Sequence, residues 1–141
     1  MSVRRFWVDT NVLLHFLTGE PAPQAEAARE LFRQAAEGQA VLDISPVIVA
    51  EAYYTLHSFY RFEREQAAEK LLLLLQQRGV KLGDASQVTG ALERLRTINT
   101  GFADAFLAAG AAKDNTPIAS FDRDFGKFKD VIRFEPGRSK Y

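Results

Sequence analysis

The chain has 141 residues, and 47% of them are hydrophobic, which suits one globular domain with a buried core and argues against disorder. Its 18 basic and 18 acidic residues cancel, which argues against a protein that coats nucleic acid through a broadly basic surface. There is no cysteine, so disulfides, thiol catalysis and thiolate zinc sites are excluded.

The chain contains no apolar run long enough for a signal peptide or a membrane span. Its longest purely apolar block, residues 71–75, falls far short of the roughly 20 residues that a membrane helix needs. We therefore expect a cytoplasmic protein without membrane contact.

The first half of the chain alternates short apolar runs with amphipathic segments. The pattern predicts strands over residues 5–8 and 40–44, and helices over residues 12–17, 24–36 and 46–59. Either Asp9 or Thr10 caps the first helix and Gly19 ends it, while Ser45 followed by Pro46 is typical of a helix start.

The second half continues the alternation. Helices are predicted over residues 64–77, 86–96 and 103–113, and strands over 79–82, 117–121 and 131–134. Short strands that alternate with helices favour an α/β fold with a parallel sheet. We expect one domain over residues 1–134 and a loose C-terminal tail over residues 135–141.

Four carboxylates, far apart in sequence, occupy positions that suit a metal site. Asp9 and Asp122 each follow a predicted strand, and Glu51 and Asp104 lie in the first two turns of predicted helices. In a parallel sheet, sites form beyond the carboxyl ends of the strands, where all four are expected. Carboxylate oxygens suit Mg²⁺ or Mn²⁺, which would offset their mutual repulsion. This favours metal-assisted phosphodiester hydrolysis.

Each of these acids also has a purely structural explanation. Asp9 could cap a helix, Asp104 could lie in a first turn because of the helix dipole, and Asp122 could begin a turn. Glu51 could be a solvated helix residue. Against these explanations, Asp104 and Glu51 are flanked by apolar residues, where a carboxylate without a partner is costly.

Polar residues beside the acids are candidates for a supporting role. Asn11 and Ser120 could orient the carboxylates or hold a water molecule, although Ser120 equally fits an ordinary strand end. Thr10 could serve only as a helix cap. Asp124 is either a further ligand or a solvated loop acid, and the loop is favoured.

Other chemically capable residues give weaker signals. His15 and His57 have no second histidine at metal spacing, which favours structural roles. The aromatic residues between positions 53 and 62 fit a core or a subunit interface better than base stacking. Five arginines are unranked candidates for phosphate contact: Arg5, Arg61, Arg64, Arg96 and Arg123.

The order of these motifs resembles a known family. The strand that ends at Asp9, the central Glu51, the run from Phe102 to Ala105 and the run from Ser120 to Phe125 are similar to those of PIN domains. More narrowly, they resemble the VapC-type toxin ribonucleases of bacterial and archaeal toxin–antitoxin modules. Each motif is short, but the order and spacing are more specific, and the resemblance covers nearly the whole chain.

The resemblance implies a three-layer α/β/α sandwich with a central, mostly parallel sheet. It implies cleavage of transfer, ribosomal or messenger RNA with Mg²⁺ or Mn²⁺, a homodimer, and inhibition by a cognate antitoxin. Residues 53–75 match the segment that forms a dimer contact or binds the partner. The implied acidic quartet is Asp9, Glu51, Asp104 and Asp122, with Asn11 and Ser120 at the polar supporting positions.

Two positions depart from the family pattern. Gly101 stands where many relatives have an acid, which bears on metal number or affinity. Ser120 stands where many have threonine, which keeps the hydroxyl.

Other functions remain as alternatives. An aspartyl-phosphate phosphatase would need a second carboxylate where this chain has Asn11. A phospho-receiver or binding module would need a phosphorylated aspartate at a strand end, whereas Asp43 lies inside a predicted strand. An RNA-maturation nuclease and an inactive PIN-type scaffold are the remaining alternatives. The expected hydrolysis leaves 5′-phosphate and 3′-hydroxyl ends and needs no 2′-hydroxyl nucleophile.

Overall fold

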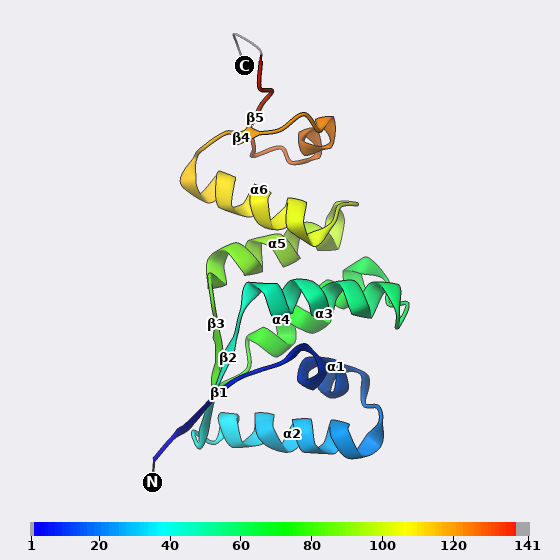
Figure 1. Cartoon of the computed structure of the whole chain (residues 1–141), viewed down its shortest axis with the longest axis vertical. Helices are drawn as coiled ribbons and strands as arrows, with labels where there is room; N and C mark the ends of the chain where they lie inside the picture. Colours follow the sequence, from blue (N-terminus) through cyan, green and yellow to red (C-terminus); the bar gives the residue numbers. More distant parts are fainter. Residues whose placement is uncertain (1, 138–141) are drawn as a thin grey trace.

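Strands and helices alternate along the polypeptide as the sequence predicts. The computed structural model describes residues 2–137. Its elements in chain order are β1 (Arg4–Trp7), α1 (Thr10–Thr18), α2 (Ala22–Ala36), β2 (Ala40–Ile44), α3 (Pro46–Ser58), α4 (Arg64–Leu75), β3 (Val80–Leu82), α5 (Ala85–Thr97), α6 (Phe102–Asp114), β4 (Ile118–Ala119), η1 (Arg123–Lys127) and β5 (Arg133–Phe134) (Figure 1). Every predicted strand and helix is present, and within residues 2–137 the short 3₁₀ helix η1 is the one element that was not predicted.

The strands form two separate parallel sheets. The larger sheet has the order β1-β2-β3, and its register aligns Phe6 with Leu42 and Leu42 with Val80. The smaller sheet pairs β4 with β5. Figure 1 shows α5 and α6 between the two sheets. The predicted α/β class and the parallel pairing are therefore confirmed.

The larger sheet differs from a sheet covered by helices on both faces. Leu42 and Ile44 are fully buried on one face, whereas Arg5, Trp7 and Lys81 on the opposite face are exposed. Helices α1 to α4 lie to one side of the strands (Figure 1). Charged residues at alternate strand positions make a second helical layer costly, because burying them would strip their water.

Two hydrophobic clusters stabilise the fold, and α6 contributes to both. The main cluster gathers buried side chains from the larger sheet and α1 to α5, and it includes Ala105 of α6. The smaller cluster joins Ala108 of α6 to Ile118, Phe125 and Phe128. Because α6 packs between two layers, it needs small side chains on several of its faces. This packing explains its alanine-rich sequence.

Close helix packing also requires small side chains where α5 meets α6. A Cβ added to Gly90 would lie 3.1 Å from the Cβ of Ala109, which is tighter than ordinary van der Waals contact. The first turn of α6, which carries Asp104, is positioned by this packing of α6 against α5.

Element boundaries shift by one or two residues from the prediction. Helix α1 begins at Thr10 and α2 at Ala22, each two residues earlier than expected. The early start of α2 places Pro23 in the first turn, where the missing N–H of proline costs nothing. Glu135, the first residue of the expected tail, forms an ion pair of 3.1 Å with Arg133. Residues 138–141 of that tail lie outside the described residues.

None of the helices within residues 2–137 combines the length and the apolar character that crossing a bilayer requires. The apolar block at residues 71–75 lies at the end of α4, where Leu71, Leu72 and Leu74 face the core.

Two leucines of this block give a matched test of the packing. Leu71 is 0% exposed and Leu73 is 67% exposed. Leu71→Ala should lower the free energy of unfolding by about 2–5 kcal/mol because it leaves a cavity. Leu73→Ala should change it by less than about 0.5 kcal/mol. Urea unfolding followed by circular dichroism measures both, and equal losses in the two variants would contradict the described packing.

Candidate acidic site

Asp9 lies at the junction between β1 and α1. Its backbone is extended and its carboxylate accepts a hydrogen bond of 2.8 Å from the N–H of Thr10. Asp9 is therefore the residue that caps α1, which settles the choice left open between Asp9 and Thr10. The side chain is exposed, so carboxylate lone pairs remain available to a further ligand.

The two residues after Asp9 differ in their surroundings. Thr10 is only 4% exposed, and its hydroxyl has no hydrogen-bond partner in the described structure. Asn11 is exposed in the first turn of α1. Within residues 2–137, no hydrogen bond joins Thr10 Oγ1 or the Asn11 amide to one of the four acids, so their supporting roles remain predictions.

Glu51 lies in the second turn of α3. Ser45 caps this helix by accepting a hydrogen bond of 3.4 Å from the N–H of Ile48, and Pro46 occupies the first turn. Because β1 and β2 are parallel neighbours, α1 and α3 begin at the same edge of the sheet. Glu51 is exposed, and its carboxylate forms no hydrogen bond or ion pair within residues 2–137.

Asp104 lies in the first turn of α6 and is half-buried. The N-cap of this helix is Gly101, which has no side chain to bind the free N–H groups. The positive end of the helix dipole favours a carboxylate here. Within the described residues Asp104 has no hydrogen-bond or ion-pair partner, so its charge is not neutralised by a cation of the chain.

Asp122 forms part of a short polar turn after β4. Its N–H donates to Ser120 Oγ at 2.9 Å, and its carboxylate accepts from the N–H of Asp124 at 2.8 Å. Ser120 and Asp122 therefore hold each other in place through this turn. Asp124 contacts the Asp122 carboxylate only through its backbone, and its own carboxylate lies 4.0 Å from Lys127 Nζ. Asp124 lies in the first turn of η1, and both of its suggested roles stay predictions.

The four acids are not gathered at one point in this structure. Asp9, Glu51 and Asp104 lie on elements that pack around α3, whereas Asp122 follows the smaller sheet. Within residues 2–137, no three His, Asp or Glu side chains lie close enough to hold one metal ion. The donor chemistry fits a hard divalent cation, since the oxygens are accessible and two of the acids have no partner. The quartet as a metal site remains a prediction.

The five candidate arginines separate into two groups, which the sequence could not rank. Arg5 and Arg96 form ion pairs with acids of the chain. The other three form no ion pair or side-chain hydrogen bond within the described residues, and they remain available to phosphate: Arg61, Arg64 and Arg123.

The exposed face of the larger sheet carries a bidentate ion pair. Arg5 Nη2 lies 2.7 Å from Asp43 Oδ1, and Arg5 Nε lies 3.1 Å from Asp43 Oδ2. Hydrogen bonding from Arg5 holds the pKa of Asp43 below its usual value, and the charges of Arg5 and Lys81 add to this effect. Asp43 therefore has a cation of the chain as its partner, unlike Glu51 and Asp104.

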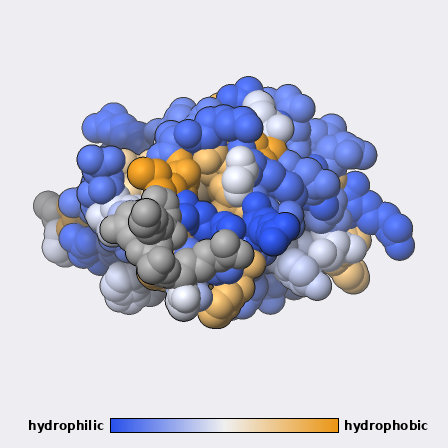
Figure 2. Space-filling view, turned by 90° about the horizontal axis from the view of Figure 1, so that it is seen from above, coloured by the Kyte–Doolittle hydropathy of each residue, from blue (hydrophilic) through white to orange (hydrophobic). Residues whose placement is uncertain are grey.

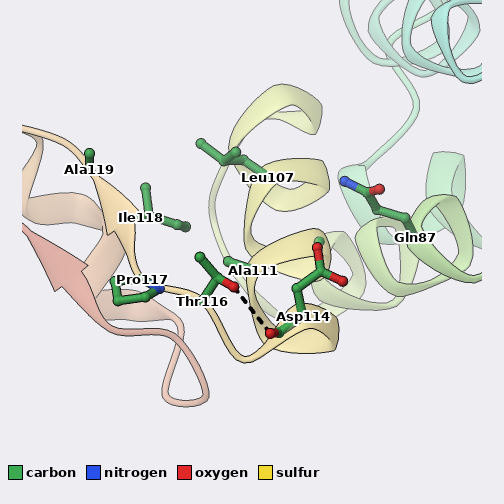
Figure 3. A pocket seen from close by; sticks show the side chains of 9 residues that line it. Gln87, Leu107, Ala111, Asp114, Thr116, Pro117, Ile118 and Ala119 are labelled. Carbon is green, nitrogen blue, oxygen red and sulfur yellow. Dashed lines mark hydrogen bonds between the residues drawn. The ribbon is translucent and has the colours of Figure 1, made fainter.

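Two hollows lie at opposite ends of α6. One, of about 340 Å³, lies between the end of α6 and β4, where Asp114, Thr116 and Ile118 line it (Figure 3). Thr116 Oγ1 donates there to the backbone oxygen of Asp114 at 3.1 Å. None of the predicted site residues lines this hollow. The other, of about 510 Å³, lies beside the first turn of α6, next to Asp104.

The end of the molecule that carries β4 and β5 is mostly hydrophilic, with small apolar areas (Figure 2). Exposed apolar side chains of this region include Phe121 at 73% and Ile132 at 60%. Phe121 directly precedes Asp122, so a large apolar side chain stands beside one of the predicted ligands.

Comparison with known proteins gives one family match. A model of the PIN domain matches residues 6–131, which include all four acidic positions. A search of curated proteins finds no match. Among solved structures, the chain is similar to the crystal structure of VapBC2 from Rickettsia felis bound to a DNA fragment from their promoter. That alignment has 17% identity and a TM-score of 0.37, and it covers 92% of this chain and 97% of that chain.

The cap at Asp9 gives a test that separates its structural role from its charge. Asp9→Asn should keep the stability of α1, because asparagine is as good a helix cap as aspartate. Asp9→Ala should lower the free energy of unfolding by about 0.5–2 kcal/mol, measured by urea unfolding. An Asp9→Ala variant as stable as the unaltered protein would contradict the capping bond.

Proposed function

The chain belongs to the PIN-domain family, and from this membership and its four carboxylates we propose that it is a metal-dependent endoribonuclease. The main support for this proposal is that the family match includes four carboxylates, which lie beside strand ends or in early helical turns. Glu51 and Asp104 support it further, since neither is neutralised by a cation among the described residues.

Asp9, Asp104 and Asp122 would hold Mg²⁺ or Mn²⁺, and Glu51 would complete the site. The bound metal would lower the pKa of a water molecule and neutralise charge on the scissile phosphate. The chain itself orients the ligands. The bond from the Thr10 N–H fixes the Asp9 carboxylate, and the bond from the Asp124 N–H fixes that of Asp122. Hydrolysis by water leaves 5′-phosphate and 3′-hydroxyl ends.

Gathering the quartet requires β1 and β4 to approach each other. Each is an edge strand with an unpaired row of backbone N–H and C=O groups. Pairing them in parallel would give one sheet in the order β3-β2-β1-β4-β5. Neighbouring strands lie about 4.8 Å apart, so Asp9 and Asp122 would become neighbours. We include this closed sheet in the proposal as the form that is competent to bind metal.

Large exposed aromatic side chains favour such a closure. Trp7 ends β1 and is 80% exposed, and Phe121 follows β4 and is 73% exposed. Each stands within two residues of a proposed ligand. Burying apolar surface is favourable by about 25 cal/mol per Å². Burial of these two aromatic side chains would therefore stabilise the pairing of β1 with β4.

The biological role that we propose is that of a cytoplasmic toxin of a type II toxin–antitoxin pair. Exposed apolar side chains on and beside α3 and α4 suit a protein partner, either a second copy or a cognate antitoxin, and they are Val47, Tyr54, Phe59 and Leu73. RNA maturation is the alternative role for the same chemistry. Induced expression distinguishes them, because a toxin arrests growth and its inactive variant does not.

Asp104→Asn tests the proposed chemistry, with Asp114→Asn as the matched control at the other end of α6. Asp104→Asn should reduce cleavage of single-stranded RNA at least about 100-fold in Mg²⁺ or Mn²⁺, while Asp114→Asn should cleave like the unaltered protein. Both should fold, since each change removes a charge without leaving a cavity. End analysis should find 5′-phosphates, and 2′,3′-cyclic phosphates would contradict the mechanism.

A further inference from the structure

The hollow of about 510 Å³ beside Asp104 has features of a binding site. It lies between the second half of α3, the first residue of α4 and the start of α6. Aromatic rings form much of its wall, and the rings of Tyr53 and Phe102 lie 6.4 Å apart. Tyr54 also lines it and is 70% exposed, so a ring face is open to a ligand.

A buried hydroxyl in this wall lacks a partner. Tyr53 is only 5% exposed, and its Oη forms no hydrogen bond in the described structure. Burying a hydroxyl without a partner is unfavourable by about 1–3 kcal/mol, so a ligand that hydrogen-bonds to it would gain affinity. The charge of Arg64 acts on this hydroxyl, opposing the rise in its pKa that burial causes, and Arg64 lines the same hollow.

Two further donors point to an anion. The side chain of Arg64 forms no ion pair or hydrogen bond within residues 2–137. The start of α6 lacks a side-chain cap, because Gly101 occupies the N-cap, and Gly101, Phe102 and Ala103 line the hollow. Free N–H groups and the helix dipole favour an anion at such an end. The hollow thus combines a cation, an unpartnered hydroxyl and an open helix start.

The position of the hollow relates it to the proposed catalytic acids. Asp104 directly follows Ala103, and Tyr54 lies one helical turn after Glu51 on the same side of α3. A chain that crosses the hollow would therefore pass beside both acids. A polymer with regularly spaced anions and flat rings fits these features.

We propose that this hollow binds an internal phosphate of the RNA strand, held by Arg64, the Tyr53 hydroxyl and the N–H groups at the start of α6, with a base against the ring of Tyr54. This inference rests on the proposed function, since it takes the ligand to be RNA. It assigns Arg64 and Tyr53 as residues that position the strand relative to the acids.

The first experiment titrates inorganic phosphate into ¹⁵N-labelled protein without added metal and follows amide signals by NMR. Saturable shifts should appear at Phe102, Ala103 and Asp104. Arg64→Gln should weaken binding at least about tenfold, because it removes a charged hydrogen bond. Arg78→Gln changes an exposed arginine beyond the other end of α4 and should leave binding unchanged. Absence of saturable shifts in the unaltered protein would overturn the proposal.

Two variants keep the test clear of folding defects. Tyr53→Phe removes a hydroxyl that has no partner, so it should fold at least as stably while it weakens phosphate binding several-fold. Gly101→Asp places a carboxylate at an extended N-cap with open space around it, so it should stabilise α6 yet abolish binding. Binding that survives in both variants would overturn the assignment of these groups.

A third experiment distinguishes RNA from free phosphate. A single-stranded RNA ten-mer without terminal phosphates should shift the same amides, and a ten-mer with neutral methylphosphonate linkages should not. If only inorganic phosphate binds, the RNA proposal is overturned. RNA that binds here but is never cleaved would refute the nuclease function alone. Cleavage with an unchanged KM in Arg64→Gln would refute this inference alone.

Discussion

Parallel pairing of β1, β2 and β3 is the constraint on which the rest of the structure depends. Each strand runs directly into a helix, so α1, α3 and α5 all begin at one edge of the larger sheet. That edge collects the positive ends of three helices. Asp9 and Glu51 lie close to the first two helix starts, and Asp104 lies at the start of α6. The backbone thus offers partial positive charge where the carboxylates lie.

The acids differ in whether the chain supplies them with a cation. Asp43 lies inside the sheet and is held by two hydrogen bonds from Arg5. Glu51 and Asp104 have no such partner within the described residues, and Asp9 and Asp122 bind only backbone N–H groups. Asp104 is half-buried, and burying a carboxylate without a cation is unfavourable unless a ligand brings positive charge. This contrast supports a metal ion as the missing partner of the quartet.

Much of the fold was predictable because it depends on local patterns. Apolar runs and helix caps such as Ser45 with Pro46 gave the elements and their order, and those were confirmed. The division into two sheets was not predictable, since periodicity says nothing about which strands pair. The one-sided burial of the larger sheet did leave a signal in the alternation of Arg5, Trp7, Asp43 and Lys81 with apolar residues.

Side-chain partners in the site were the least predictable feature. Arg5 reaches Asp43 diagonally, although its direct partner in the register is Val41, so this pair depends on the pairing of β1 with β2. Arg5 and Arg64 are equal candidates for phosphate contact in the sequence, and only the tertiary structure separates them. Tyr53 was assigned to a core or interface, and its unpartnered hydroxyl depends on how α3 meets α6. Such features have no signal in spacing or composition.

Paramagnetic broadening of amide signals by Mn²⁺ in ¹⁵N-labelled protein tests whether the four acids bind one metal ion. If the four acids share one site, the amides of Thr10, Ala52, Ala105 and Arg123 broaden together at the same Mn²⁺ concentration. Asp104→Asn should then weaken all four effects at once. Broadening confined to one of these amides, or unchanged by Asp104→Asn, would contradict a shared metal site.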